Sequence, residues 1–196
     1  MPSQTANRPR LILASGSPRR KHLLNEAGLL FEVIESGVIE DKREEETAPD
    51  FVLRMATAKA LAVSAKARGA MVLGADTIVE VDGDIVGKPA DPEQAREMLQ
   101  RLSGRSHNVI TAFAIAKDRR ILESQSAITQ VRFRQLSERE ITEYVAGTEP
   151  YDKAGGYAAQ GAGAAFIAHI DGSYTNVMGL PLKESLAALR RHHVMW

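Results

Sequence analysis

Two adjacent arginines, Arg19 and Arg20, stand where a short apolar run gives way to helical spacing, in the segment SGSPRR. Ser17 is placed to cap a helix that Pro18 begins, and the unpaired N–H groups of a helix start favour an anion. Guanidinium groups add planar, bidentate donors that fit phosphate oxygens. The segment therefore predicts phosphate binding, although a capped helix with two solvated arginines explains it about equally well.

Two further polar residues occur in settings typical of a phosphate or metal site. Asp76 follows the apolar run 71–74, and in open α/β sheets ligands gather beyond the carboxyl ends of strands. Its carboxylate can hold a divalent metal ion or orient water, and a solvated loop residue is the alternative. Lys88 lies between a glycine and a proline, in backbone that cannot be helical. A lysine there suits a phosphate, although a surface loop lysine is the commoner outcome.

A segment dense in glycine and alanine, DKAGGYAAQGAGAAF, spans residues 152–166. Four of its residues have side chains that can form directed polar bonds: Asp152, Lys153, Tyr157 and Gln160. Its glycines allow tight turns and close backbone packing, which by itself is a common reason for glycine. The chain contains no G-x-x-x-x-G-K-[ST] pattern, so it is not a P-loop protein.

Composition limits the partners of these residues. In 196 residues, 25 Lys+Arg balance 25 Asp+Glu, so no overall field favours nucleic acid or an anionic membrane. We therefore expect a small ligand held by a local cluster. The absence of cysteine excludes thiolate chemistry and suits a reducing compartment. No apolar run approaches the roughly 20 residues of a membrane span, and the first ten residues lack a signal-peptide core. We expect a cytoplasmic protein.

Strand and helix patterns alternate along the chain, which predicts an α/β architecture to position these residues. We expect strands at 11–14, 31–34, 71–74, 77–81, 85–86, 108–116 and 126–134, the last two as antiparallel neighbours. We expect helices at 18–27, 50–68, 92–102, 137–147 and 182–191, with a capping box at Ser137 and Glu140. No linker divides the chain, so two lobes would share an interface.

Seven sequence blocks are similar, in type and order, to those of the Maf family of nucleoside triphosphate pyrophosphatases. They read LASGSPRRKHLL, RMATAKA, GADTIV, GKP, LSGRSHNVITA, DKAGGYAAQGAGAAFI and YTNVMGLPL. The resemblance implies one domain over residues 1–196. Its expected fold is an elongated mixed β-sheet flanked by helices, with two lobes and a central cleft, as in the inosine triphosphate pyrophosphatases. It further implies a homodimer and a divalent cation, Mg²⁺ or Mn²⁺.

The reaction implied by this resemblance is hydrolysis of a nucleoside triphosphate between its α and β phosphates, which releases a monophosphate and pyrophosphate. Asp76 matches the family's catalytic acidic residue, as general base or as metal ligand. Glu40 occupies the position of a second acidic metal ligand, in a loop that lacks the aspartate often preceding it. The matching phosphate-binding residues are Ser15, Arg19, Arg20, Lys59 and Lys88.

Base preference within the family follows three positions, which here are Arg19, Thr77 and Gln160. They resemble the dTTP/UTP branch, whereas the 7-methyl-GTP branch carries glutamate where Gln160 stands. An amide presents a donor and an acceptor to the O4 and N3–H edge of thymine or uracil, and a carboxylate would repel that O4. The resemblance therefore implies pyrimidine nucleotides, with modified pyrimidines among the possible substrates.

Three alternatives stay open at this point. The same chemistry can act on 7-methyl-GTP or on a deaminated purine triphosphate. A nucleotide-binding regulator of cell division without turnover is a second reading, because the family is associated with inhibition of septum formation. A phosphatase that removes the terminal phosphate is the third, and it is disfavoured because Asp76 does not lie in a D-x-D-x-T nucleophile pattern.

Overall fold

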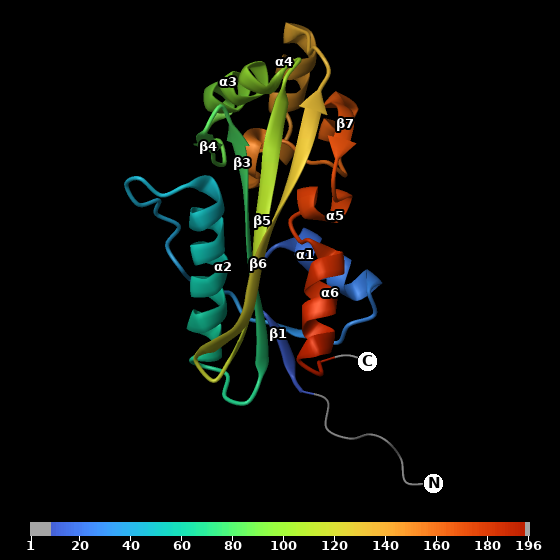
Figure 1. Ribbon diagram of the computed structural model, residues 1–196. Helices are drawn as coiled ribbons and strands as arrows, with labels where there is room; N and C mark the ends of the chain where they lie inside the picture. Colours follow the sequence, from blue (N-terminus) through green and yellow to red (C-terminus); the bar gives the residue numbers. More distant parts are fainter. Residues whose placement is uncertain (1–8, 195–196) are drawn as a thin grey trace. The chain divides into compact units, whose positions relative to one another are not determined.

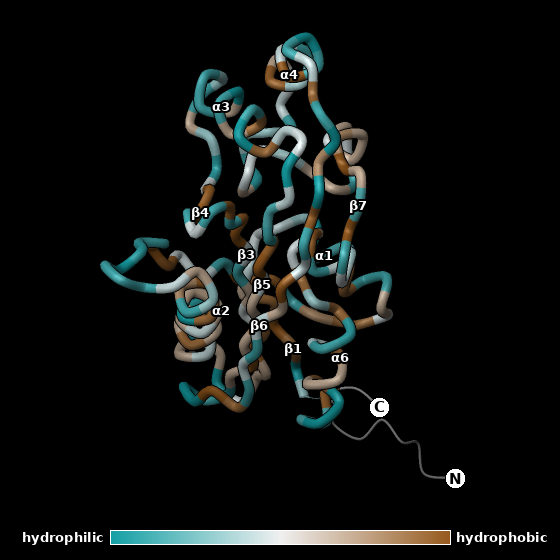
Figure 2. The backbone as a smooth tube through the Cα atoms, turned by 45° about the horizontal axis from the view of Figure 1, so that its top comes forward, coloured by the Kyte–Doolittle hydropathy of each residue, from teal (hydrophilic) through white to brown (hydrophobic). Residues whose placement is uncertain are grey.

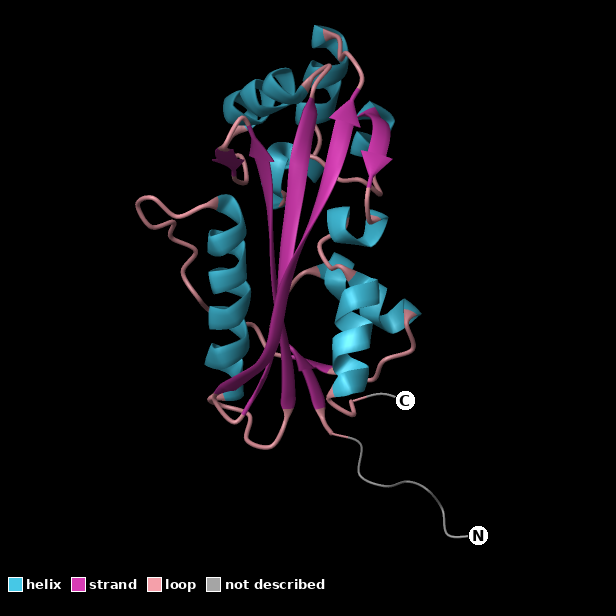
Figure 3. Cartoon of the chain, viewed as in Figure 1, coloured by secondary structure: helices cyan, strands magenta, loops and turns pink. Residues whose placement is uncertain are grey.

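The computed structural model describes residues 9–194, in which seven strands form one mixed sheet accompanied by helices (Figures 1 and 3). The strands are β1 (Leu11–Leu13), β2 (Glu32–Val33), β3 (Met71–Val81), β4 (Asp84–Val86), β5 (Ser106–Lys117), β6 (Arg120–Phe133) and β7 (Ile167–Asp171). Their order is β2-β1-β3-β5-β6-β7, and β4 pairs with β3 outside this path. The predicted α/β fold with a mixed sheet is confirmed.

Six α-helices and three 3₁₀ helices occur among the described residues. The α-helices are α1 (Pro18–Glu26), α2 (Ala48–Ser64), α3 (Pro92–Leu102), α4 (Glu138–Val145), α5 (Tyr174–Val177) and α6 (Leu182–Arg191). The 3₁₀ helices are η1 (Glu149–Asp152), η2 (Ala154–Gly156) and η3 (Ala162–Phe166). None of the helices in this part of the chain has the length and apolar character needed to cross a membrane.

The structure confirms several predicted elements and shows the local interactions that form them. The helices at 92–102 and 182–191 have the predicted bounds. The capping box is present: the Ser137 side chain accepts from the Glu140 N–H, and the Glu140 carboxylate accepts from the Ser137 N–H. A two-residue turn, Asp118-Arg119 with positive φ at both residues, joins the hydrogen-bonded neighbours β5 and β6. So short a connection makes them antiparallel, as predicted.

Other predictions need correction. The strands predicted at 71–74 and 77–81 are one continuous strand, β3, so Asp76 lies within a strand instead of beyond its end. Helix α2 ends at Ser64, earlier than predicted, because the Lys66 N–H bonds to Val63 O in a tighter turn. Ser17 is the N-cap of α1, but its side chain forms no capping bond. Strand β7 and the 3₁₀ helices were not predicted, because the apolar residues in these segments have no clear helical or strand periodicity.

The chain divides into two compact units, and β3, β5 and β6 contribute residues to each. In the first unit, described over 9–76, 112–126 and 179–194, β1 lies between β2 and β3 and is parallel to both. Helix α2 approaches β3 very closely there: a Cβ atom at Gly74 would lie 2.5 Å from Ala56 O and 2.6 Å from Ala60 N. Only glycine permits this separation between the helix and the strand.

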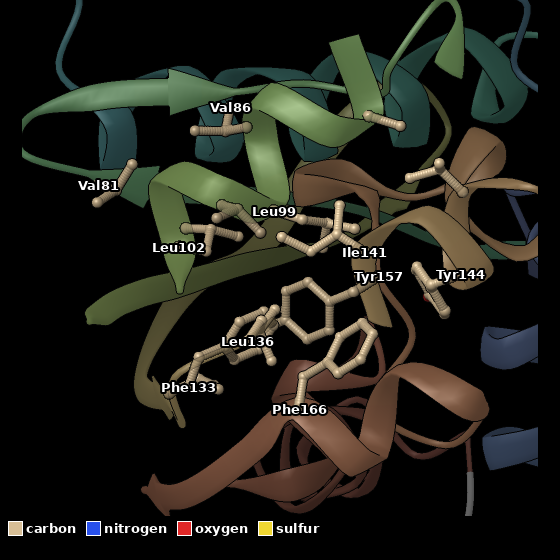
Figure 4. Close-up of a cluster of buried hydrophobic side chains, with 14 of the residues drawn as sticks. Val81, Val86, Leu99, Leu102, Phe133, Leu136, Ile141, Tyr144, Tyr157 and Phe166 are labelled. Atoms are coloured by element: carbon tan, nitrogen blue, oxygen red, sulfur yellow. The ribbon is translucent and has the colours of Figure 1, made fainter. Parts of the chain in front are cut away.

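The second unit, residues 77–111 and 127–178, is built on an apolar cluster with aromatic rings at its centre (Figure 4). Phe133 packs edge-on against Tyr157 and Phe166, with ring centroids 4.7 and 5.9 Å apart. Tyr144 of α4 packs against Phe166 with a centroid separation of 4.8 Å. These contacts join α4 and the 3₁₀ segment to the sheet, so the glycine-rich segment 152–166 rests on a packed core.

We predict that Gly74→Ala destabilises the protein by about 1–3 kcal/mol, because the added methyl group must displace the backbone of α2. Urea unfolding gives the free energy of unfolding. Gly87→Ala is the matched control, since a Cβ atom there would meet no described atom within 4 Å. Equal stability of the two variants would show that α2 can move away from β3 without cost.

Candidate active site

A buried lysine of the first unit joins two carboxylates. The Lys59 ammonium donates to Asp76 Oδ1 at 2.6 Å and to Glu40 Oε1 at 2.5 Å. Lys59 is 7% exposed and Asp76 is 5% exposed, whereas the Glu40 side chain is 48% exposed. Lys59 stands between Ala56 and Ala60 in sequence, the residues whose backbone meets Gly74, so the close approach of α2 delivers its ammonium to β3.

The electrostatics of this cluster follow from burial. Removal from water raises the pKa of Asp76, against the opposing attraction of Lys59 and Arg20. Burial also lowers the pKa of the Arg20 guanidinium, while the charge of Asp76 acts in the opposite direction. Both pKa shifts mean that burial destabilises the charged form of each side chain. Each charge is therefore stabilised by the opposite charge of its partner.

Arg20 is the buried member of the arginine pair. Its Nε donates to Gly179 O at 2.7 Å and its Nη1 donates to Ser15 Oγ at 2.9 Å. The Ser15 hydroxyl also accepts from the Ser17 N–H at 3.3 Å. The turn between β1 and α1 is thereby fixed to the start of the C-terminal segment. Arg19 is only half-buried, so the two arginines have different surroundings.

The loop that carries Glu40, residues 34–47, is hydrophilic over much of its length and is held by α2 (Figure 2). The Arg54 guanidinium donates to both carboxylate oxygens of Glu46 at 2.6 Å and to Asp41 O at 2.8 Å. Hydrogen bonding to Arg54 lowers the pKa of Glu46 to about 2, against a smaller effect of burial. Arg54 therefore fixes the backbone next to Glu40, a role that the sequence did not reveal.

Thr77, the residue after Asp76, belongs to the second unit and to a polar network there. Its hydroxyl lies 3.0 Å from the Thr111 hydroxyl, which donates to Asn176 O at 3.0 Å. Because Thr111 has a single hydroxyl proton, Thr77 is the donor between the two threonines. Asn176 is fully buried and donates to Val109 O and Thr129 Oγ1. Asn176 lies in the block YTNVMGLPL, but its residue type and position predicted no role for it.

Lys88 and Gln160 are exposed residues of the second unit. Lys88 follows β4 in a loop that is held by the glycine-rich segment, because the Gly155 N–H donates to Gly87 O at 2.9 Å. Gly155 has φ +72, and a Cβ atom there would lie 2.8 Å from Val79 Cγ2. The block GKP, in which Lys88 was predicted to bind phosphate, is therefore held directly by the glycine-rich block 152–166.

The predicted site residues fall into two groups. Ser15 contacts Arg20, and Glu40 and Asp76 meet on Lys59, all in the first unit. Residues 77, 88 and 160 belong to the second. No group of three acidic or histidine side chains suited to a metal ion occurs among the described residues. However, the carboxylates of Glu40 and Asp76 both contact the Lys59 ammonium nitrogen. One or two carboxylates, together with phosphate oxygens and water, are a common set of ligands for Mg²⁺.

Comparisons with known proteins show the family to which this chain belongs. Residues 10–192 match the model of the family described as Maf-like protein. The dTTP/UTP pyrophosphatase of Syntrophus aciditrophicus (strain SB) is 51% identical over 182 residues, covering 92% of this chain and 89% of that protein. The dTTP/UTP pyrophosphatase of Escherichia coli (strain K12) is 46% identical over 186 residues, covering 94% of each.

The fold is also similar to a solved structure, that of a HAM1 protein from Coxiella burnetii. The two agree with a TM-score of 0.52 over 93% of this chain and 99% of that chain, at 13% sequence identity. So low an identity supports a common fold and nothing further.

We predict that wild-type protein loses stability relative to Asp76→Asn as the pH rises from about 4 through the raised pKa of Asp76. In that window the folded protein retains a proton that the unfolded chain has already released. Urea unfolding of both proteins at intervals from about pH 4 to pH 8 measures the difference. A difference that does not vary with pH would contradict the raised pKa.

Proposed function

The chain belongs to the Maf family, and on that premise we propose that it hydrolyses dTTP and UTP to the monophosphate and pyrophosphate. The observation that carries the proposal is the 46–51% identity to dTTP/UTP pyrophosphatases over more than nine-tenths of the chain. The buried Lys59–Asp76 pair and the partly exposed Glu40 that contacts Lys59 supply the charged groups that such a reaction needs.

We assign the activation of water to Asp76. A buried carboxylate with a raised pKa is a stronger base than a solvated one, which suits it to take a proton from the attacking water. The Lys59 ammonium orients this carboxylate through a 2.6 Å hydrogen bond. Because α2 and β3 are both rigid elements, the base is held in one orientation before substrate arrives.

The proposal includes a divalent cation, Mg²⁺ or Mn²⁺, held by Glu40 and Asp76. Their hard oxygen atoms suit such an ion, and both already face a positive charge on Lys59. When bound, the ion would lower the pKa of water and neutralise phosphate charge. Lys59 would then share the two carboxylates with the ion and lie beside the phosphates.

Binding of the triphosphate is assigned to cationic and hydroxyl groups whose positive charge offsets the phosphates and the leaving pyrophosphate. Arg20 is fixed by Gly179 O and Ser15, so its guanidinium keeps one orientation. Lys88 stands in a loop held by Gly155. The assigned residues are Ser15, Arg19, Arg20, Lys59 and Lys88.

Base selection is assigned to Thr77 and Gln160, with Arg19. The amide of Gln160 offers a donor and an acceptor to thymine or uracil, and the Thr77 hydroxyl is oriented by Thr111. A site built to satisfy buried polar groups rejects a base that leaves them unpaired. The single domain, the homodimer and the cytoplasmic location stay predictions, and light scattering on the purified protein tests the homodimer.

The test of this function is a panel of dTTP, UTP, CTP, 7-methyl-GTP and ITP, each incubated with Mg²⁺ and the purified protein. We predict that dTTP and UTP are hydrolysed fastest, and that Asp76→Asn lowers their turnover by about 10²–10⁴-fold while binding persists. Asp82→Asn is the control, since Asp82 lies in an exposed turn and pairs with Arg105. Turnover confined to another base, or full activity of Asp76→Asn, would contradict the proposal.

We predict that Gln160→Glu lowers kcat/KM for dTTP and UTP by about tenfold or more, because a carboxylate repels O4 of the base. Turnover of 7-methyl-GTP should fall less. Gln125→Glu introduces the same charge at an exposed position of β6 and serves as the control. An equal loss on every nucleotide would assign Gln160 a structural role instead.

A further inference from the structure

The turn that carries Gln160 is held on both sides by the same pair of side chains, Glu149 and Tyr144. After Gln160, Glu149 Oε2 accepts from the Ala162 N–H at 3.0 Å, and Oε1 accepts from the Gly163 N–H at 2.9 Å. Before Gln160, the Tyr144 hydroxyl accepts from the Ala158 N–H at 3.3 Å. The same hydroxyl donates to Glu149 Oε1 at 2.7 Å, which joins the two supports.

The glycines of this turn are explained by the same pair. A Cβ atom at Gly161 would lie 2.1 Å from Glu149 Oε2, and one at Gly163 would lie 2.8 Å from the Tyr144 hydroxyl. Gly161 has φ −113, so a left-handed conformation is not the reason for glycine there. The glycines let the backbone approach the carboxylate and the hydroxyl closely enough for its N–H groups to be bound.

The pair rests on rigid elements. Tyr144 belongs to α4, whose first turn is fixed by the capping box, and its ring packs on Phe166 in the apolar cluster (Figure 4). Glu149 begins η1, and the Tyr151 hydroxyl of the same 3₁₀ helix donates to Val145 O at 2.6 Å. The turn is therefore attached to packed structure and not to another loop.

Glu149 is ionised at neutral pH. Burial raises its pKa, but the Gly163 N–H, the Tyr144 hydroxyl and the Ala162 N–H stabilise the carboxylate and bring the pKa below its ordinary value. A charged acceptor makes these hydrogen bonds stronger than neutral ones.

We propose that Glu149 and Tyr144 are positioning residues for base selection, because they fix the backbone on both sides of Gln160. The inference rests on the proposed role of Gln160 in recognising the pyrimidine. Selection between bases requires an amide held within a fraction of an ångström, and a misplacement of about 1 Å costs on the order of a hundredfold in rate. Loss of Glu149 or of the Tyr144 hydroxyl should therefore reduce the discrimination between bases more than it reduces the rate of hydrolysis.

The test compares Glu149→Ala and Tyr144→Phe with wild type in two measurements. The first is kcat and KM for dTTP and for 7-methyl-GTP. The second is amide hydrogen exchange over residues 158–163. We expect the preference for dTTP to fall by about tenfold in both variants, with faster exchange in the turn. Tyr144→Phe keeps the ring that packs on Phe166, so it separates loss of the hydroxyl from loss of the fold.

Glu143→Ala is the control, since Glu143 is on the same helix but pairs with Arg139 at the surface. An equal fall in kcat/KM for both nucleotides, or an unchanged preference with unchanged exchange, would overturn this inference alone. A wild-type protein without preference for dTTP would instead overturn the proposed function, and with it the selection that the turn would serve.

Discussion

The contact between the Lys59 ammonium and the Asp76 carboxylate is the constraint on which the first unit depends. Both groups are buried, and an unpaired charge in that position would cost several kcal/mol. The pair therefore fixes the distance between α2 and β3, and Gly74 is the residue that makes the distance possible. Glu40 reaches the same ammonium, so the loop 34–47 is held in place by the charge that also binds Asp76.

The second unit positions the residues assigned to substrate binding by a different means. Gln160 and Lys88 are exposed and lie in turns, and these turns are held by hydrogen bonds to backbone groups. Glycine lets the bonded partners approach closely, and the aromatic cluster gives the turns a rigid support. In the proposed function, the first unit carries Asp76 and most of the residues assigned to the phosphates, and the second carries Lys88 and the residues assigned to selection of the nucleobase.

Sequence reasoning predicted what local patterns encode. The helices at 92–102 and 182–191 were predicted with their observed bounds, and the capping box predicted the start of α4. Only the family resemblance identified Lys59 as a site residue. Lysines are common on amphipathic helices, and no local pattern distinguishes a buried one. The supports of Gln160 lie 11 and 16 residues earlier in the chain, so only the packing of α4 and η1 brings them to the turn. Asp76 was placed beyond a strand because a charged residue normally ends one, and its partner on α2 is what allows it inside.

The position of the broken bond tests the proposed function most directly. Wild-type protein would be incubated with dTTP and Mg²⁺ in water labelled with heavy oxygen, and the products separated and weighed by mass spectrometry. We predict dTMP and pyrophosphate in equal amounts, with one labelled oxygen entering per bond broken. Release of dTDP and inorganic phosphate would mean that the Lys59–Asp76 centre serves a terminal phosphatase, and the assignment of pyrophosphohydrolysis would be wrong.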